Sequence, residues 1–521
     1  PCEREDTMIR LSTSSRTCGP HAQRFFRHRV ALWTAVSVLS SFAVGGPVLD
    51  IGTRKQLFLD DAFIQEKRDV AFVMHPPRKM GPVILPELPS EAGRVGLYGS
   101  VAEVDGAFMM WYWAFERRVD GKGRRGLALA RSPDGVTWEK PILGVVERGG
   151  NKANNLVPAM GDTVSLNPSG PPEERFVLLS PEGWGDSQEG GLFLRFSADG
   201  IHYRLHPTRV FPFVPDTQNQ VRYDRRLGKW VAYLRLWDPG RRVGRVEIDD
   251  LKAPWPFAGD HPPHRLWGKD HPPVPRKEIQ TVLAVDEDDP DECDVYTPVV
   301  VEYPWADNAY VMFPSFYRHF PEPNRGGRFT NDGLLEAHLA VSRDGVGWSR
   351  PSRRPYIALG PEGAPDSKMM FVFAGLVRTG DEIHHYYCGY DVTHGQYAGT
   401  PELHHKGAIC RAVQRLDGFV SLSAGVPGGD VTTVPLTFAG SHLELNIVAA
   451  ATGECCVELL DEEGAVIPGY EYEACDPIYG DSTHHRVSWR GRDDVGALAS
   501  QTIQLRILLA NADVYAFQFV E

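Results

Sequence analysis

The sequence lacks the short motifs that mark several large enzyme classes. It has no phosphate-binding glycine loop, no dinucleotide-binding fingerprint, no serine nucleophile elbow and no HExxH metal motif. Its eight cysteines show none of the spacings that bind zinc. Nothing in the sequence therefore indicates a nucleotide or zinc cofactor, and we expect neither a cofactor nor a metal site.

The chain also lacks an excess of positive charge and a long apolar run. It carries 55 Lys and Arg against 68 Asp and Glu, a net charge of −13, which argues against nucleic acid or an anionic membrane as partner. The apolar stretch near the N-terminus is about fifteen residues long, too short and too rich in serine for a membrane span. A basic run precedes it and small residues follow it, which is typical of a secretory signal peptide. We expect residues 1–46 to be leader and signal peptide, and the mature chain to be secreted or periplasmic without a membrane span.

Helical periodicity is almost absent, whereas a strand pattern recurs along the chain. Between Tyr98 and Trp138 an aromatic strand is followed by a strand that ends in an S-x-D-G-x-x-W turn. The same pair returns at residues 175–203, 229–250, 309–348 and 382–422, and four of the five copies carry Asp-Gly. A four-stranded unit repeated around a ring is a β-propeller, so the sequence predicts an all-β fold with five blades. We expect the Asp-Gly turns to be structural rather than catalytic.

The pattern changes near Leu422. Beyond it, short alternating strands without blade pairs predict a separate β-sandwich. The expected domains are therefore a propeller at residues 47–424 and a sandwich at residues 425–521. The early strand LFLDDAFI, residues 57–64, is expected to add an outer strand to the last blade, with a structural role for its two acids.

Cysteine positions leave the thiol chemistry open. Cys388 and Cys410 lie on consecutive predicted strands and are candidates for a disulfide. Cys475 is a candidate to pair with Cys455 or Cys456. Free buried thiols are an equal alternative, and no feature of the sequence fixes an oligomeric state.

Several segments resemble a known group of enzymes. FLDDAFI, the S-x-D-G-x-x-W/Y turns and the C-terminal strands resemble the five-bladed propeller glycoside hydrolases of families 32 and 43. DTQN, YVMFPSFYRH, RLDGFVSL and VYAFQF look closer to secreted, family 32-like proteins of planctomycete-type bacteria. The resemblance implies an exported glycoside hydrolase with an oligo- or polysaccharide substrate. The family signatures W-M-N-D-P-N-G, R-D-P and E-C are absent, so the resemblance assigns no catalytic residue. Such propellers can hold an axial calcium ion, but the sequence shows no ligand set for it.

Glycoside hydrolysis needs one protonated and one ionised carboxyl group on either side of the scissile bond. The inner strand of each blade starts at the same mouth, so acids at these starts are expected to converge. The catalytic candidates are Asp216, at a polar strand entrance; Glu278, a base beside an arginine; and Glu91, a general acid in a proline-rich loop. An Asx turn or a solvated loop charge is the alternative for each. The candidates for substrate binding are Asp162, Asn219, Arg235, Asp294, Arg318, His319, Asp391 and His394.

Two other functions remain open at this stage. A polysaccharide lyase on the same scaffold would use a His or Tyr base and an Arg that neutralises a uronate carboxylate, which would favour His319, His394 and Arg318. A carbohydrate-binding propeller without catalysis is the third hypothesis. Tyr317, Tyr390 and Trp113 are candidate stacking platforms or core residues.

Overall fold

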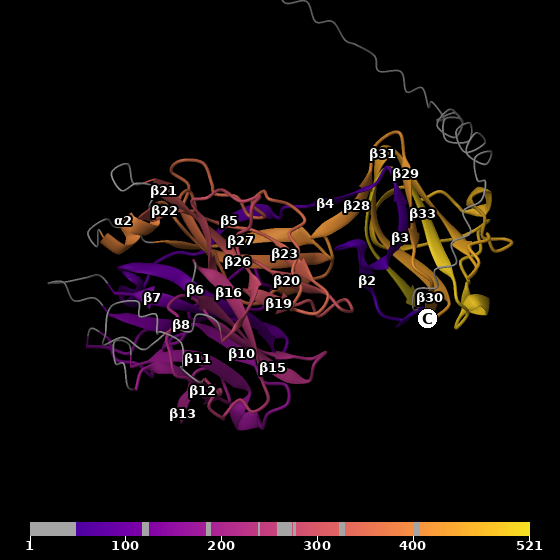
Figure 1. Ribbon diagram of the computed structural model, residues 1–521. Coiled ribbons are helices and arrows are strands. Elements are labelled where there is room, and N and C mark those ends of the chain that lie inside the picture. The colour runs from indigo at the N-terminus through magenta and orange to yellow at the C-terminus, as the bar shows by residue number, and fades with distance from the viewer. Residues whose placement is uncertain are drawn as a thin grey trace, which may run out of the picture. The chain divides into compact units, whose positions relative to one another are not determined.

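The computed structural model describes residues 48–116, 124–148, 150–183, 189–237, 240–257, 274, 278–321, 329–399 and 407–521, without the side chains of 329 and 397–399. The predicted leader, with Cys2 and Cys18, lies outside the described residues. Residues 49–521 form one compact unit. It is built almost entirely of strands, as predicted (Figure 1). The described helical elements are short: η1 (Asp61–Phe63), η2 (Pro89–Glu91), η3 (Pro172–Glu174), α2 (His394–Gly399), η4 (Tyr472–Ala474) and η5 (Gly496–Leu498).

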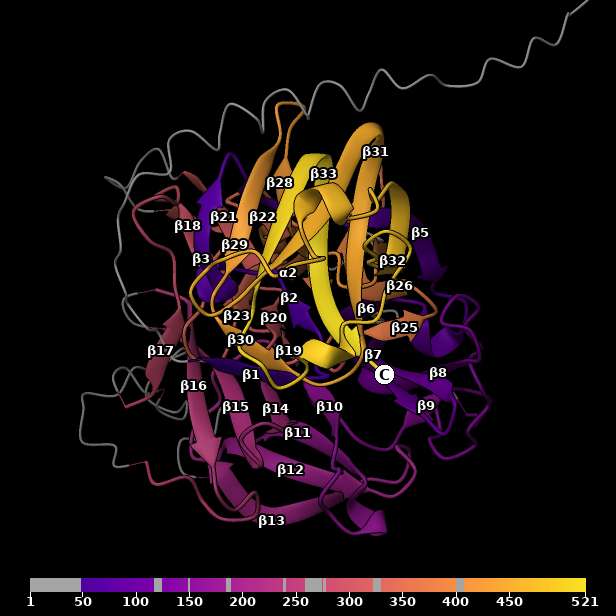
Figure 2. The same ribbon diagram turned by 90° about the vertical axis from the view of Figure 1, so that its right-hand side faces the viewer.

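Three antiparallel sheets of four strands each follow the predicted repeat (Figures 1 and 2). The first contains β6 (Arg94–Val104), β7 (Ala107–Phe115), β8 (Arg125–Ser132) and β9 (Leu156–Val157). The second contains β10 (Thr163–Leu166), β11 (Phe176–Glu182), β12 (Gly191–Ser197) and β13 (Arg204–Phe211). The third contains β14 (Gln220–Asp224), β15 (Lys229–Leu236), β16 (Arg242–Ile248) and β17 (Gln280–Leu283). In each sheet the strands pair in chain order.

The fourth and fifth predicted copies share one eight-stranded sheet. It contains β18 (Cys293–Thr297), β21 (Ser315–Pro321), β22 (Phe329–Ala337), β24 (Met369–Val372), β25 (Val377–Thr379), β26 (Glu382–Tyr390), β27 (Ala408–Arg415) and β5 (Arg78–Ile84). A further sheet holds β19 (Val300–Glu302), β20 (Tyr310–Met312) and β23 (Ala340–Ser342). The two halves of the large sheet join at one parallel pair, Leu335 with Met369. In the described chain, the propeller-like arrangement therefore contains four main sheets. Five separate blades were expected.

The Asp-Gly turns have the structural role that was predicted for them. Asp134 accepts hydrogen bonds from the amides of Val136 and Thr137, at 2.8 Å each, and Ser132 Oγ accepts from Gly135. Gly135 has a φ of +70°, which L side chains rarely adopt. The same bonds recur at the turns after Ser197 and Ser342.

The LFLDDAFI segment does not close the ring. The outer strand beside β27 is β5, while β2 (Gln56–Leu57) and β3 (Ile64–Arg68) pair with C-terminal strands. The segment is not one continuous strand, because Asp60 caps η1 by accepting a hydrogen bond from the amide of Ala62. Asp60 also pairs with Arg343 at 2.9 Å, a structural contact.

The C-terminal strands form an eight-stranded sheet with its own buried apolar cluster. Its longest members are β31 (His442–Leu460) and β33 (Gln504–Val520), which pair along most of their length (Figure 2). The others are β2, β3, β4 (Ala71–Met74), β28 (Val420–Ala424), β29 (Gly429–Thr433) and β32 (Gly480–Arg486). A separate parallel pair joins β1 (Leu49–Gly52) and β30 (Leu436–Phe438).

The six described cysteines are buried free thiols. Cys410 lies opposite Tyr387 in the β26–β27 register, whereas Cys388 lies opposite Ile409. Because side chains alternate along a strand, the two thiols point to opposite faces of the sheet, in two different apolar clusters. The candidate Cys388–Cys410 disulfide is therefore wrong. Cys475 likewise forms no disulfide with Cys455 or Cys456.

Candidate active site

Polar residues at the starts of the inner strands gather at one end of the ring. Asp162 directly precedes β10, Asn219 directly precedes β14, and Asp294 lies at the start of β18. Neighbouring inner strands are bonded to one another, since Thr163 Oγ1 donates to the carbonyl of Asn219 at 2.8 Å. Gln218 Nε2 likewise donates to the carbonyl of Gly99 at 3.1 Å. The predicted convergence of strand starts is therefore present for the second and third units, and Thr217 Oγ1 connects them to the fourth unit through the carbonyl of Tyr296.

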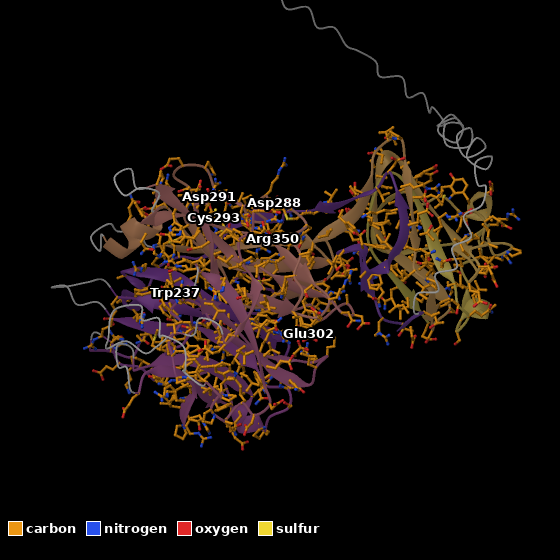
Figure 3. All side chains as sticks on the ribbon, viewed as in Figure 1. Trp237, Asp288, Asp291, Cys293, Glu302 and Arg350 are labelled. Carbon is orange, nitrogen blue, oxygen red and sulfur yellow. The ribbon has the colours of Figure 1, made fainter. Side chains whose placement is uncertain are left out.

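Asp216 forms an ion pair with a buried arginine. Arg235, in β15, is 1% exposed, and its Nη2 lies 2.5 Å from Oδ2 of Asp216, whose side chain is 30% exposed. The guanidinium lies over the rings of Trp237, at 4.2 Å, and Tyr296, at 4.7 Å. The main chain also holds Arg235, because its amide donates to Asn219 Oδ1 at 3.1 Å. Asp216 thus presents a carboxylate to solvent beside the fixed positive charge of Arg235. Figure 3 labels Trp237, whose ring lies against the same guanidinium.

The backbone at this position is strained. Asp216 has a φ of +58° and Thr217 a φ of +84°. A left-handed β-branched residue is an outlier that costs about 1–3 kcal/mol and persists where the surroundings enforce it. Here Tyr98 donates to Thr217 Oγ1 at 3.2 Å, and Oγ1 donates to the carbonyl of Tyr296 at 3.3 Å. Such strain is concentrated at functional sites in proteins.

Asp162 is a buried carboxyl group beside this ion pair. It is 5% exposed, and Asn219 Nδ2 donates to its Oδ2 at 3.2 Å. Burial raises the pKa of Asp162 to about 7. The hydrogen bonds from Asn219 lower this pKa, and the negative charge of Asp216 raises it further. The raised pKa favours the protonated form of Asp162, which makes it a potential proton donor.

A third acid of the cluster, Asp294, lies at the start of β18. Asp294 Oδ2 accepts from Arg241 Nη1 at 2.8 Å and lies 3.2 Å from His319 Nε2. Burial alone would raise the pKa of Asp294, but the hydrogen bond from His319 and the charge of Arg241 outweigh it and lower the pKa. His319 Nδ1 donates to the carbonyl of Thr330 at 2.8 Å, which fixes the ring. Asp294 is therefore held as an anion.

His394 lies in contact with two tyrosines. Its Nε2 lies 3.0 Å from the hydroxyl of Tyr296, and its Nδ1 lies 3.1 Å from the hydroxyl of Tyr317 and 3.3 Å from the carbonyl of Asn331. Burial lowers the pKa of His394 to about 4, and the charges of Arg241 and Arg235 act in the same direction. The imidazole is therefore neutral near pH 7 and can exchange hydrogen bonds with both phenols.

Arg241 connects these groups, and sequence reasoning missed it. Its guanidinium lies 4.9 Å from the ring of Trp237, 5.5 Å from that of Tyr296 and 5.3 Å from that of Tyr317. It donates to Asn331 Oδ1 at 3.1 Å. Sequence reasoning also missed Trp237 and Tyr296 as site residues. A usable signal was present, because Trp237 and Arg241 flank the β15–β16 turn at the end where the inner strands start.

The cluster contains seven predicted residues: Asp162, Asp216, Asn219, Arg235, Asp294, His319 and His394. Two other predicted residues, Arg318 and Asp391, lie outside this cluster. Arg318 is exposed and alternates with Tyr317 and His319 along β21, so it faces the other side of the sheet. Asp391 is exposed and follows the end of β26.

Glu278 and Glu91 also lie elsewhere. Glu278 is half-buried and precedes β17, which is the outer strand of the third sheet rather than an inner strand. Glu91 is 0% exposed and accepts from the hydroxyl of Tyr112 at 2.6 Å and from Lys140 Nζ at 2.8 Å. It also accepts from the backbone amides of Glu87 and Leu88. These contacts are those of a structural anchor.

Within the described ranges, no group of three His, Cys, Asp or Glu side chains is arranged to hold a metal ion. No helix in this part of the chain is long and apolar enough to cross a membrane.

No family model and no curated protein sequence matches the chain. Several solved structures that resemble it are named as glycoside hydrolases. One named "Glycoside hydrolase" is 15% identical, with a TM-score of 0.41, and the match covers 65% of this chain and 92% of that one. A glycosyl hydrolase from Bacteroides ovatus is 13% identical (TM-score 0.41, 70% and 97% covered). An N-acetylgalactosamine deacetylase from F. plautii, in complex with blood group B trisaccharide, is 14% identical (TM-score 0.42, 68% and 97% covered). At these values the likeness carries no argument about the reaction, which depends on the residues of the site.

Proposed function

We propose that this protein is an exported glycoside hydrolase that cleaves a glycosidic bond of an oligo- or polysaccharide with Asp162 and Asp216. One observation carries the proposal: two neighbouring carboxyl groups lie in different environments, one buried and the other partly exposed beside a guanidinium. Asp162 is buried with a pKa raised to about 7, and Asp216 is paired with the Arg235 guanidinium. Such a pair supplies the acid and the ionised carboxylate that glycoside hydrolysis needs.

The roles follow from these environments. Asp162 donates its proton to the glycosidic oxygen as the bond from that oxygen to the sugar breaks. Asp216, as a carboxylate, either activates the water that completes the hydrolysis or attacks the sugar directly and is then released by water. Positive charge that develops on the sugar is stabilised by Asp216 and by the anionic Asp294. Trp237, which is half-buried, is the aromatic side chain proposed to contact the sugar ring.

The same proposal includes the finer architecture. We read the eight-stranded sheet as two blades in contact, because β22 and β24 share a single residue pair. This reading yields a five-bladed propeller within the predicted residues 47–424, a C-terminal sandwich at 425–521 and a leader at 1–46. The strand pairing moves β1 to β4 and β28 from the predicted propeller range to the C-terminal unit. Membership of a family 32-like group and secretion belong to this proposal as well.

A second candidate function is a polysaccharide lyase, and His394 is the observation that favours it. Its neutral ring faces the hydroxyl of Tyr296 at 3.0 Å, with Arg241 close to the same tyrosine. A Tyr–His pair can take the proton α to a uronate carboxylate while an arginine neutralises that carboxylate. The C4–O bond would then break and leave an unsaturated sugar. Burial raises the pKa of Tyr296, which disfavours the phenolate base and makes the hydrolase the better candidate.

The pH dependence of hydrolysis distinguishes the roles of Asp162. If its protonated form is the acid, kcat/KM falls tenfold per pH unit above about pH 7, because the proton is lost there. If the ionised form were the working species, kcat/KM would rise through the same range. Initial rates of reducing-end release from pH 4 to 10 measure the sign. The Asp162→Asn variant should be strongly impaired and should lose this alkaline limb.

A further inference from the structure

Asn219 connects the two carboxyl groups proposed above. It is 1% exposed. Its Nδ2 donates to Asp162 Oδ2 at 3.2 Å, and its Oδ1 accepts from the backbone amide of Arg235 at 3.1 Å. Arg235 in turn forms the ion pair with Asp216. One buried asparagine therefore lies between the proposed acid and the ion pair that holds the proposed ionised carboxylate.

Every polar group of Asn219 is occupied. Its backbone amide also donates to Asp162 Oδ2, at 3.4 Å, and its carbonyl accepts from Thr163 Oγ1 at 2.8 Å. Nδ2 has a second acceptor, the carbonyl of Thr217 at 3.1 Å. A contact of Asn219 with substrate, which the sequence suggested, would require one of these bonds to break. The contacts favour a role inside the protein instead.

The neighbours of Asn219 fix the orientation of its side-chain amide. The backbone amide of Arg235 can only donate, so it faces the side-chain oxygen. The carbonyl of Thr217 can only accept, so it faces the side-chain nitrogen. The opposite orientation would place a donor against a donor and an acceptor against an acceptor. Nδ2 is therefore directed at Asp162 by contacts in which Asp162 takes no part.

The two carboxyl oxygens of Asp162 have different surroundings. Oδ2 accepts from both the backbone amide and Nδ2 of Asn219, whereas Oδ1 makes no hydrogen bond within the described chain. Each carboxyl oxygen has two lone pairs, and both of those on Oδ2 face a donor, so the protonated acid carries its proton on Oδ1. The same two bonds stabilise the ionised form, and they lower the pKa that burial raises to about 7.

Two charged groups also act on Asp162. The carboxylate of Asp216 raises its pKa, and the guanidinium of Arg125 lowers it. Arg125 is exposed, and its guanidinium lies over the ring of Trp113 at 4.7 Å. Within the described chain neither Asp216 nor Arg125 is hydrogen-bonded to Asn219, so a change of the asparagine leaves both charges in the protein.

We propose that Asn219 is a positioning residue that occupies Oδ2 of Asp162 and thereby places the proton of the acid on Oδ1. The proposal rests on the hydrolase proposed above, in which Asp162 protonates the glycosidic oxygen. In that step the Oδ1–H bond breaks, the proton goes to the glycosidic oxygen, and Asp162 remains as a carboxylate. Asn219 already donates two hydrogen bonds to this carboxylate, so it stabilises the form of the acid that the step produces.

Infrared difference spectra of the purified protein during a pH titration, without substrate, test the proposal. The carbonyl-stretch band of protonated Asp162 is identified by its absence in Asp162→Asn. Asn219→Ala removes a donor to the carbonyl oxygen Oδ2, so the band should move to higher wavenumber. Loss of a bond to the ionised form should also raise the pKa of Asp162, and the band should persist to a pH about one unit higher. The alkaline limb of kcat/KM should move in the same direction.

Asn155→Ala is the matched control. Asn155 is also fully buried, but its Nδ2 donates to the hydroxyl of Tyr112 and to the carbonyl of Leu129, outside the acid cluster. It should leave the wavenumber of the band and the pH of its loss unchanged.

Asn219→Asp is a second variant, with nearly the shape of the original side chain. It keeps an acceptor for the backbone amide of Arg235 but replaces Nδ2 by an oxygen. The Asp162 band, identified by adding Asp162→Asn to this variant, should again move to higher wavenumber and persist to higher pH.

An unchanged band in both Asn219 variants, or the same change in Asn155→Ala, would overturn the proposal. Because the spectra need no substrate, they are independent of whether a glycan is cleaved. Glycan hydrolysis together with an unresponsive band would contradict the positioning role alone. The expected band changes in a protein that cleaves no glycan would support the placement of the proton on Oδ1 and contradict the hydrolase.

Discussion

Asp216→Asn is expected to lower kcat/KM for glycan hydrolysis about 10³-fold, the largest effect on activity of any substitution considered. The amide keeps the shape of the side chain but removes the charge that faces the developing positive charge on the sugar. Arg235, which is 1% exposed, keeps one acceptor in the new amide oxygen. Steady-state kinetics, corrected for the folded fraction by circular dichroism, measure the loss.

Glu278→Gln is the matched control for that experiment. It removes the same charge from a residue beside the outer strand β17, away from the inner-strand starts. It should retain at least about half of the activity, because Glu278 lies outside the cluster of site residues. If Glu278→Gln lost the activity and Asp216→Asn kept it, the assignment of the ionised carboxylate to Asp216 would be wrong.

Glu91→Ala is expected to lower the free energy of unfolding by about 3 kcal/mol or more. The substitution removes a fully buried carboxylate and leaves Lys140, whose side chain is 9% exposed, beside an empty position. It also leaves the hydroxyl of Tyr112 without its acceptor. Urea denaturation followed by tryptophan fluorescence measures the change.

The exposed neighbour Glu87 provides the comparison. Glu87 pairs with the same lysine at 3.1 Å, but its side chain is 71% exposed, so Glu87→Gln should cost less than about 1 kcal/mol. Activity per folded molecule should be normal in both variants. A Glu91 variant of normal stability that has lost activity would instead restore Glu91 as the general acid.

The convergence of Asp162, Asp216 and Asp294 was predictable from the sequence, because a repeated strand unit places equivalent strand starts at one end of a ring. The role of each acid was not predictable in the same way. Asp162 was expected to bind substrate, whereas burial and the nearby Asp216 raise its pKa, which is why we propose it as the proton donor. Burial depends on packing between strands far apart in the chain, which the local pattern does not contain.

Glu91 and Glu278 illustrate two other limits. Glu91 was chosen because its loop is apolar and proline-rich, but its partner Lys140 lies 49 residues further along the chain. Glu278 was placed before an inner strand, whereas β17 pairs with β16 as an outer strand. LFLDDAFI was misplaced for the same reason, since β2 and β3 find their partners in β33 and β29, hundreds of residues away. Strand pairing at such separations leaves no trace in local periodicity.

The most direct test of the central claim is a panel of glycans incubated with the purified protein, with reducing ends and ultraviolet absorbance read together. New reducing ends without absorbance, absent in the Asp162→Asn and Asp216→Asn variants, are the result expected for a hydrolase that uses this carboxyl pair. Ultraviolet absorbance from an unsaturated product, retained in both variants and lost in His394→Phe, would contradict the hydrolase and identify a lyase.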